Sequence, residues 1–204
     1  GKNVWAAVRN TSSRRYLTDK RINFIELDFS SADRLRRILG GHTFDYVVHA
    51  AGVTKCLHRD DFHRVNTLGT KNLVDALLAL QMPLRRFVFI SSLSVYGAVC
   101  ERQPYRDISE NDIPRPNTAY GRSKLEAERY LESIGNDFPY IILRPTGVYG
   151  PREKDYFLMA RSIASHVDFA VGYRRQDITF VYVKDVVQAV FLALGRGVGG
   201  GKDF

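Results

Sequence analysis

The sequence predicts an α/β protein built on a Rossmann-like, doubly wound parallel sheet. Apolar runs typical of buried strands occur at residues 4–8, 22–29, 44–49, 87–90 and 140–143. Segments whose apolar residues have helical spacing lie between several of these runs, which is the alternation of βαβ units. Turns rich in small and hydroxyl residues follow the runs that end at residues 49 and 90. Because ligands of such sheets bind at the carboxyl ends of the strands, a site is expected at these turns.

The first half of the chain supplies three strands and two helices. After the strands at 4–8 and 22–29, the serines and the aspartate of residues 30–33 favour the start of a helix, which continues to about Leu39. The strand at 44–49 leads into Ala50, Ala51 and Gly52, whose small size lets the backbone approach a ligand closely. Apolar residues at helical spacing then predict a helix to about Leu80.

The second half continues the alternation. The strand at 87–90 ends in a serine loop, residues 91–97, and a long proline-containing stretch separates this loop from Tyr120. Irregular stretches of this length are usually functional in compact domains. A helix from Tyr120 to about Ile134, a strand at 140–143, a helix at 156–165 and a strand at 178–183 complete the pattern.

Composition restricts the partners. The chain has 204 residues, 45% of them hydrophobic, and a net charge of +8. Its arginine pairs are scattered through different elements and are not interleaved with aromatic residues on one face, so we expect solvated surfaces and no nucleic-acid partner. Cys56 and Cys100 form neither a redox pair nor a zinc spacing, and no apolar run is long enough to cross a bilayer. We therefore expect a cytoplasmic protein without a membrane partner.

A cluster of Cys56, His58, Asp60, Asp61 and His63 invites a metal hypothesis. The two histidines differ by five positions, whereas ligands on one helix face differ by four. The spacing fits no zinc pattern, so we predict a solvated loop here and no metal site.

Three residues carry the predicted chemistry: Ser92, Tyr120 and Lys124. Tyr120 and Lys124 are four residues apart and therefore share a face of their helix. A free phenol with a pKa of about 10 is a poor base, but a neighbouring ammonium lowers that pKa. We expect Lys124 to do this and to donate to a ribose, while Ser92 holds a substrate oxygen and Tyr120 gives or takes its proton. Such an arrangement suits hydride transfer with a nicotinamide cofactor. The alternative is a tyrosine and a lysine with a structural role only.

The pairing of Ser-Ser-x-x-Val-Tyr-Gly at 91–97 with Tyr-x-x-x-Lys at 120–124 resembles the extended short-chain dehydrogenase/reductases. This NAD(P)-dependent epimerase/dehydratase group works mostly on nucleotide sugars, and the resemblance covers nearly the whole chain. It implies an NAD(P)-binding domain over residues 1–150. It also implies that 151–204 begins a substrate-binding lobe and contains a strand and helix that return to the first domain. The family's glycine-rich first βα unit is absent from these residues, so we expect the protein to continue upstream, and most of the C-terminal lobe to follow residue 204.

The resemblance also assigns cofactor contacts. Arg9, at the end of a strand where no acidic residue stands, favours NADP over NAD; the alternative is a surface arginine. Asp28 and Phe29 match the family's adenine-binding pair, although Asp28 could instead cap the following helix. The remaining expected contacts, together with Tyr120 and Lys124, are Ala50, Ala51, Gly52, Thr54, Asn66, Ser91 and Pro145.

The expected function is epimerisation or reduction at a hydroxyl or keto carbon of a nucleotide sugar or similar small molecule, by a protein that resembles homodimeric enzymes. The family's dehydratases carry an Asp-Glu pair where this chain has Leu93 and Ser94, so dehydration is disfavoured. A cofactor-sensing regulatory protein of the same fold is the alternative from another class. A nucleic-acid binder has only the net charge in its favour.

Overall fold

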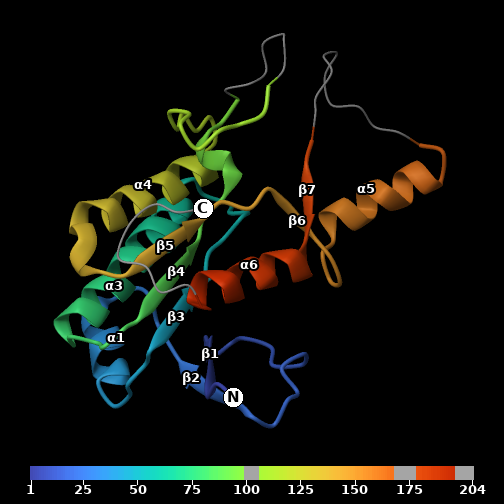
Figure 1. The fold of residues 1–204 in the computed structure, drawn as a ribbon. Coiled ribbons are helices and arrows are strands. Elements are labelled where there is room, and N and C mark those ends of the chain that lie inside the picture. Colours follow the sequence, from blue (N-terminus) through green and yellow to red (C-terminus); the bar gives the residue numbers. More distant parts are fainter. Residues whose placement is uncertain (99–105, 168–177, 196–204) are drawn as a thin grey trace.

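The computed structural model describes residues 1–98, 106–167 and 178–195 and shows parallel strands flanked by helices (Figure 1). Cys100 and parts of the predicted substrate lobe lie outside these described residues. The strands are β1 (Val4–Val8), β2 (Ile22–Glu26), β3 (Tyr46–His49), β4 (Arg86–Ile90), β5 (Tyr140–Leu143), β6 (Gly147–Tyr149) and β7 (Phe180–Tyr182). Every strand pairing among the described residues is parallel, which confirms the predicted fold class.

The strands form three hydrogen-bonded groups: β1-β2, β3-β4-β5 and β6-β7. Within the described residues, β1 pairs only with β2, and Val4 is 50% exposed. The run at 4–8 forms a strand as predicted, but only Val8 of it is buried in the part of the chain that the structure describes. The expected additional strand upstream stays a prediction. Strand β2 ends at Glu26, two residues earlier than Asp28, so Asp28 lies in the turn that follows the strand.

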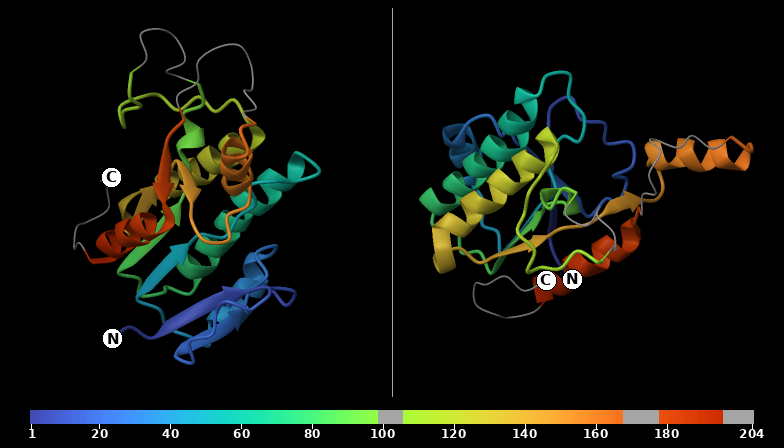
Figure 2. Two further views of the ribbon diagram at one scale, coloured as in Figure 1. Left: turned by 90° about the vertical axis from the view of Figure 1, so that its right-hand side faces the viewer. Right: turned by 90° about the horizontal axis from the view of Figure 1, so that it is seen from above.

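Helices cover both faces of the β3-β4-β5 sheet (Figure 2). The helices α1 (Ala32–Leu39), α3 (Gly69–Ala79) and α4 (Ala119–Ile134) lie on one face, and α6 (Val183–Gly195) lies on the other. Short α2 (Asp60–Phe62) continues through a π-helix (His63–Leu68) into α3. Helix α5 (Asp155–Ala164) projects away from the sheet in Figure 1. Short 3₁₀ helices span Leu93–Val95 and Gly135–Asp137.

The core follows from the alternation of side chains along β4. Phe87 and Phe89 are fully buried in the cluster that also contains Leu77 of α3 and Leu131 of α4. Val88 points to the opposite face and packs in a second cluster with α6. Successive side chains of a strand point to opposite faces of the sheet, so a strand covered on both faces is apolar throughout. This is why the run at 87–90 predicted a buried strand correctly.

Helix starts also follow the sequence. Ser31 caps α1, because its Oγ accepts a hydrogen bond from the backbone N–H of Arg34. The alternative role of Asp28 as this cap is thereby excluded. No helix in the part of the chain that the structure describes is both long and apolar enough to cross a bilayer.

Candidate active site

A cavity of about 750 Å³ opens where the carboxyl ends of β3, β4 and β5 meet the first residues of α4. Eight predicted site residues line it on the sheet side, together with their neighbour Val53: Ala50, Gly52, Thr54, Ser91, Ser92, Tyr120, Lys124 and Pro145. Residues at and just before the start of the predicted lobe form the other wall: Thr146, Gly147, Val148, Glu153, Asp155 and Tyr156. The structure therefore brings Ser92, Tyr120 and Lys124 into one cavity, as their spacing predicted.

Ser92 is held in place by its own loop. Its Oγ accepts from the backbone N–H of Ser94 at 3.2 Å and donates to Ser94 Oγ at 3.1 Å. The Ser92 side chain also interacts with the Tyr120 phenol and lowers its pKa. Helix α4 can come this close because residue 121 is glycine: a Cβ there would lie 2.4 Å from the carbonyl oxygen of Ser94. The serine loop and the tyrosine are thus fixed against each other.

The structure does not show the expected lowering of the Tyr120 pKa by Lys124, which stays a prediction. The net shift of the Tyr120 pKa is upward, chiefly because the phenol is buried, with a further rise from Tyr156. Lys124 Nζ donates to the carbonyl oxygen of Ile90 at 2.6 Å and lies 4.3 Å from the centre of the Phe89 ring. The ammonium is thus directed to the end of β4. Burial lowers the pKa of Lys124 to about 8, against a smaller opposing effect of Glu128.

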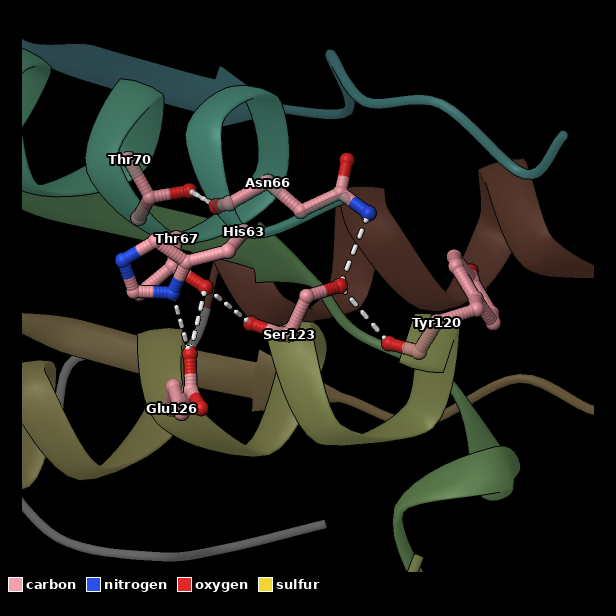
Figure 3. Close-up of polar contacts among 7 residues, drawn as sticks. All are labelled: His63, Asn66, Thr67, Thr70, Tyr120, Ser123 and Glu126. Carbon is pink, nitrogen blue, oxygen red and sulfur yellow. Dashed lines mark hydrogen bonds and ion pairs between the residues drawn. The ribbon is translucent and has the colours of Figure 1, made fainter. Parts of the chain in front are cut away.

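Asn66 supports the cavity wall from behind and does not line it. Its Oδ1 accepts from the backbone N–H of Val53 at 2.8 Å, and its Nδ2 donates to Val53 O and to Ser123 Oγ, each at 3.0 Å. Ser123 Oγ in turn donates to the carbonyl oxygen of Tyr120 at 2.7 Å (Figure 3). Asn66 thereby connects the loop after β3 with the first turn of α4, and its expected cofactor contact stays a prediction.

The π-helix places a second set of contacts beside the first. Thr67 Oγ1 donates to the carbonyl oxygen of Ser123 at 2.9 Å and to Glu126 at 3.1 Å. Glu126 also pairs with His63 Nδ1 at 2.6 Å (Figure 3). A π-helical turn contains one residue more than an α-helical turn would, and this brings Asn66 and Thr67 to the same side, facing α4.

Arg144, the residue before Pro145, connects three elements beneath the cavity. Its guanidinium forms a bidentate ion pair with Glu128 of α4, with an Nη2–Oε2 distance of 2.7 Å, and Nη1 donates to the Tyr96 hydroxyl at 2.6 Å. Glu128 is fully buried and the Arg144 side chain is 21% exposed. Removing either charge would leave the other buried without its partner.

Other predicted residues lie away from the cavity. Arg9 is exposed beyond the end of β1, and the Asp28 carboxylate accepts from the N–H of Ser30 and pairs with Arg34 at 2.6 Å. Hydrogen bonds from the side chain and the backbone of Ser30, followed by that from Arg34, lower the pKa of Asp28 to about 2. Phe29 packs near His49, with ring centres 5.7 Å apart, and Ala51 is exposed outside the cavity lining. Their cofactor roles stay predictions. Within the described ranges, no group of three His, Cys, Asp or Glu side chains could hold a metal ion.

No sequence pattern marked the individual residues of the far wall. Lys55 pairs with Asp155 at 2.7 Å across the cavity, and Glu153 and Tyr156 stand beside them. Lys55 and Asp155 are 100 positions apart. The run of small residues before Lys55 predicted a ligand-binding turn near it, but no local pattern predicted that Asp155 or Tyr156 lines the cavity.

The sequence model of the NAD dependent epimerase/dehydratase family matches residues 1–204, the whole chain. The chain belongs to this family. A curated relative, the uncharacterised UDP-glucose epimerase YtcB of Bacillus subtilis, is 31% identical over 198 residues, which cover 90% of this chain and 58% of YtcB. The chain thus spans little more than half the length of this epimerase/dehydratase family relative.

Two solved structures resemble this family member throughout. Bordetella bronchiseptica WbmH, in complex with NAD⁺, is 26% identical with a TM-score of 0.78, and the match covers 99% of this chain and 67% of WbmH. MoeE5, in complex with UDP-glucose and NAD, is 29% identical with a TM-score of 0.75, covering 99% of this chain and 69% of MoeE5. The suspected extended short-chain dehydrogenase/reductase relationship is confirmed.

The cavity of this epimerase/dehydratase family member suits a nicotinamide cofactor. Ser91 Oγ is buried and lacks a hydrogen-bond partner within the described residues, and Ser91 lines the cavity. Buried polar groups are normally hydrogen-bonded, so this hydroxyl is available to a ligand. Ala50 and Gly52 on the same wall leave room for close approach, and the cavity volume lies in the range of small-molecule sites.

Proposed function

We propose that the protein is an NAD(P)-dependent epimerase or ketoreductase of a nucleotide sugar, with Tyr120 as its acid/base residue. The observation that carries this proposal is the meeting of Ser92, Tyr120 and Lys124 in one cavity at the carboxyl ends of three parallel strands. Membership in the epimerase/dehydratase family supports the reaction class. The UDP-glucose bound by MoeE5 supports the substrate class.

The residues divide the work as follows. A nicotinamide cofactor would supply or accept the hydride, held by Lys124, Ser91, Pro145 and the small residues after β3. Because burial raises the pKa of Tyr120, its phenol is protonated at neutral pH and is ready to donate a proton to a carbonyl oxygen. Ser92, which contacts this phenol, holds the same oxygen. For the reverse reaction, the Lys124 ammonium must turn from Ile90 O toward the phenol to favour the phenolate.

Epimerisation or reduction is favoured over dehydration. Elimination of water needs an acid and a base beyond the tyrosine, and Leu93 and Ser94 stand next to Ser92 where such a pair would act. A leucine cannot move a proton, and the Ser94 hydroxyl already bonds Ser92. Formation of a dehydrated product from the nucleotide sugar would contradict this preference.

Of the two nicotinamide cofactors, we propose NADP rather than NAD. Arg9 lies exposed at the carboxyl end of β1, and an arginine at this place accommodates a 2′-phosphate. An Arg9→Ala variant is expected to weaken NADP binding about tenfold through loss of one charge-assisted contact, and to leave NAD binding unchanged. Arg21→Ala, in the turn before β2, is the matched control. Equal effects on both cofactors would contradict the assignment. Homodimer formation stays a prediction, which sedimentation would test.

The decisive experiment replaces Tyr120 by phenylalanine. In the protein supplied with NAD or NADP and UDP-glucose, turnover is expected to fall about 100-fold or more, because the proton donor is lost while the ring is kept. Cofactor affinity, measured by nicotinamide fluorescence, is expected to stay within about twofold. Tyr16→Phe, an exposed phenol in the turn before β2, is the control. Undiminished turnover by Tyr120→Phe would overturn the proposal.

A further inference from the structure

A second phenol, Tyr156, lies in the wall of the cavity opposite the sheet. It is the second residue of α5, and its place is fixed by Glu153. The Glu153 carboxylate accepts hydrogen bonds from the backbone N–H groups of Asp155 at 2.6 Å, Tyr156 at 2.8 Å and Phe157 at 3.1 Å. A carboxylate at this end of a helix satisfies free N–H groups and interacts favourably with the helix dipole. The backbone of Tyr156 is therefore well anchored.

The ring of Tyr156 is placed by two residues of the β6-β7 pair. It meets Phe180 edge to face, with ring centres 4.9 Å apart and an angle of 78° between the planes. Its hydroxyl end lies over Gly147: a Cβ at that position would be 2.7 Å from Oη and 3.0 Å from Cζ. Gly147 and Phe180 are register partners in the two strands. The phenol occupies this part of the cavity only because residue 147 has no side chain.

The hydroxyl of Tyr156 has no hydrogen-bond partner in the part of the chain that the structure describes, although the side chain is half-buried. A phenolic hydroxyl can both donate and accept. Tyr156 and Tyr120 both line this cavity. Tyr120 belongs to α4 and Tyr156 to α5, so the two phenols enter the cavity from different helices.

We propose that Tyr156 is a specificity-determining residue that hydrogen-bonds a hydroxyl of the substrate's sugar ring, in the space that Gly147 leaves open. This inference rests on the proposed function. The ligand that Tyr156 fits is the pyranose of a nucleoside diphosphate sugar. The aromatic ring of Tyr156 would cover apolar C–H groups of the sugar, and its hydroxyl would pair with a hydroxyl of the sugar. Tyr120 then acts on the reacting oxygen, and Tyr156 fixes which sugar, and which face of it, is presented.

Two substitutions test this role in different ways. Tyr156→Phe removes only the hydroxyl. Gly147→Ala keeps the hydroxyl but forces the phenol to move, because the new methyl group would lie within 3.0 Å of the far end of a movable side chain. Tyr149→Phe is the matched control, since Tyr149 packs on Tyr182 and does not line the cavity.

The measurement is calorimetric binding of UDP-glucose and of UDP to the protein loaded with NADP, the cofactor proposed above. Tyr156→Phe and Gly147→Ala are each expected to weaken UDP-glucose binding about fivefold, the size of one lost hydrogen bond, and to leave UDP binding within about twofold. The Tyr149→Phe control is expected to match the unmodified protein for both ligands. The KM for UDP-glucose should rise in parallel while kcat changes little, which separates binding by Tyr156 from proton transfer by Tyr120.

The outcomes separate the two proposals. Unchanged UDP-glucose affinity in Tyr156→Phe would overturn the role of the hydroxyl, and an equal loss of UDP affinity would overturn recognition of the sugar. Undiminished turnover by Tyr120→Phe overturns the proposed function instead. The binding comparison between UDP-glucose and UDP does not depend on turnover, so it tests Tyr156 in either case.

Discussion

Most of the predicted ligand-binding residues at the carboxyl ends of β3, β4 and β5 line a cavity, whereas those at the ends of β1 and β2 lie away from it. At the first place, Ser92, Tyr120 and Lys124 share a cavity, and contacts behind it hold the walls together. At the second, Arg9 is exposed and Asp28 pairs with Arg34 of its own neighbourhood. The first region is packed on β4, which is buried on both faces, whereas Arg9 and the Asp28–Arg34 pair of the second are exposed to solvent. Substitutions are therefore expected to cost more stability in the first region than in the second.

The largest effect is expected from the buried ion pair beneath the cavity. Glu128→Ala leaves the guanidinium of Arg144 without its counter-charge, so the free energy of unfolding is expected to fall by about 3 kcal/mol or more. Urea denaturation measures this. Asp19→Ala, which removes the exposed partner of Arg21, is the control and is expected to show no measurable change. Equal effects at the two sites would remove the contrast between the regions.

Lys124 makes the buried region sensitive to alkaline pH. Its pKa is lowered to about 8 in the folded protein from an ordinary 10.5. Between these values the unfolded chain binds the proton that the folded protein has released, so this group raises stability as pH rises through the window. Below pH 8 the buried Lys124 is charged, so its burial then lowers the free energy of unfolding by the full amount.

The test compares unfolding free energies at pH 7.5 and pH 10. Relative to Lys124→Met, the unmodified protein is expected to gain about 2 to 3 kcal/mol across this interval. Lys20→Met, in an exposed turn, is the control and should show no such relative gain. A pH-independent difference between the protein and Lys124→Met would contradict the assignment.

An intermediate effect is expected at Asn66. Asn66→Ala removes three hydrogen bonds that join the loop after β3 to α4, so the unfolding free energy is expected to fall by about 2 kcal/mol. Asn72→Ala, which removes one bond to Phe29 O, is expected to lower it by about 1 kcal/mol. Cofactor affinity should fall for Asn66→Ala, since Val53 lines the cavity. A smaller loss of unfolding free energy for Asn66→Ala than for Asn72→Ala would contradict the view that Asn66 holds the loop after β3 against α4.

The smallest change in stability is expected at Asp28. Its ion pair with Arg34 is exposed, so Asp28→Asn should alter the unfolding free energy by less than about 0.5 kcal/mol. If the carboxylate turns to an adenine amino group when cofactor binds, the affinity for NAD should fall roughly threefold or more. Asp33→Asn, the exposed partner of Arg36, is the control and should leave affinity unchanged. Equal affinities of the two variants would contradict the adenine contact.

The elements that local patterns define were predictable. The run at 87–90 became a strand buried on both faces, and the helix from Tyr120 ends at Ile134 as expected. The four-residue spacing of Tyr120 and Lys124, together with a serine at a strand end, located the cavity. These features depend on the period of a helix and on the chemistry of strand ends, both of which are visible in a sequence.

Features that depend on tertiary contacts were not predictable. Lys124 is directed to Ile90 O because a carbonyl at the end of β4 lies within reach, and no spacing in the sequence encodes that proximity. The sequence also did not indicate that the Asn66 amide makes three hydrogen bonds, with Val53 and Ser123 on two other segments. Tyr156 enters the cavity only because β6 and β7 bring Gly147 and Phe180 together. The expected division at residue 150 stays a prediction.

Because His63–Leu68 form a π-helix, the number of residues in this segment determines which side chains face α4. Deleting Leu68 alone would restore ordinary α-helical pairing, but it would turn Asn66 by about 100° relative to the Leu73 side of α3. Either the apolar contacts of α3 or the amide contacts with Ser123 would then be out of phase. The number of residues in this stretch is therefore tied to the contacts of Asn66, and a one-residue deletion here is expected to break one of the two sets.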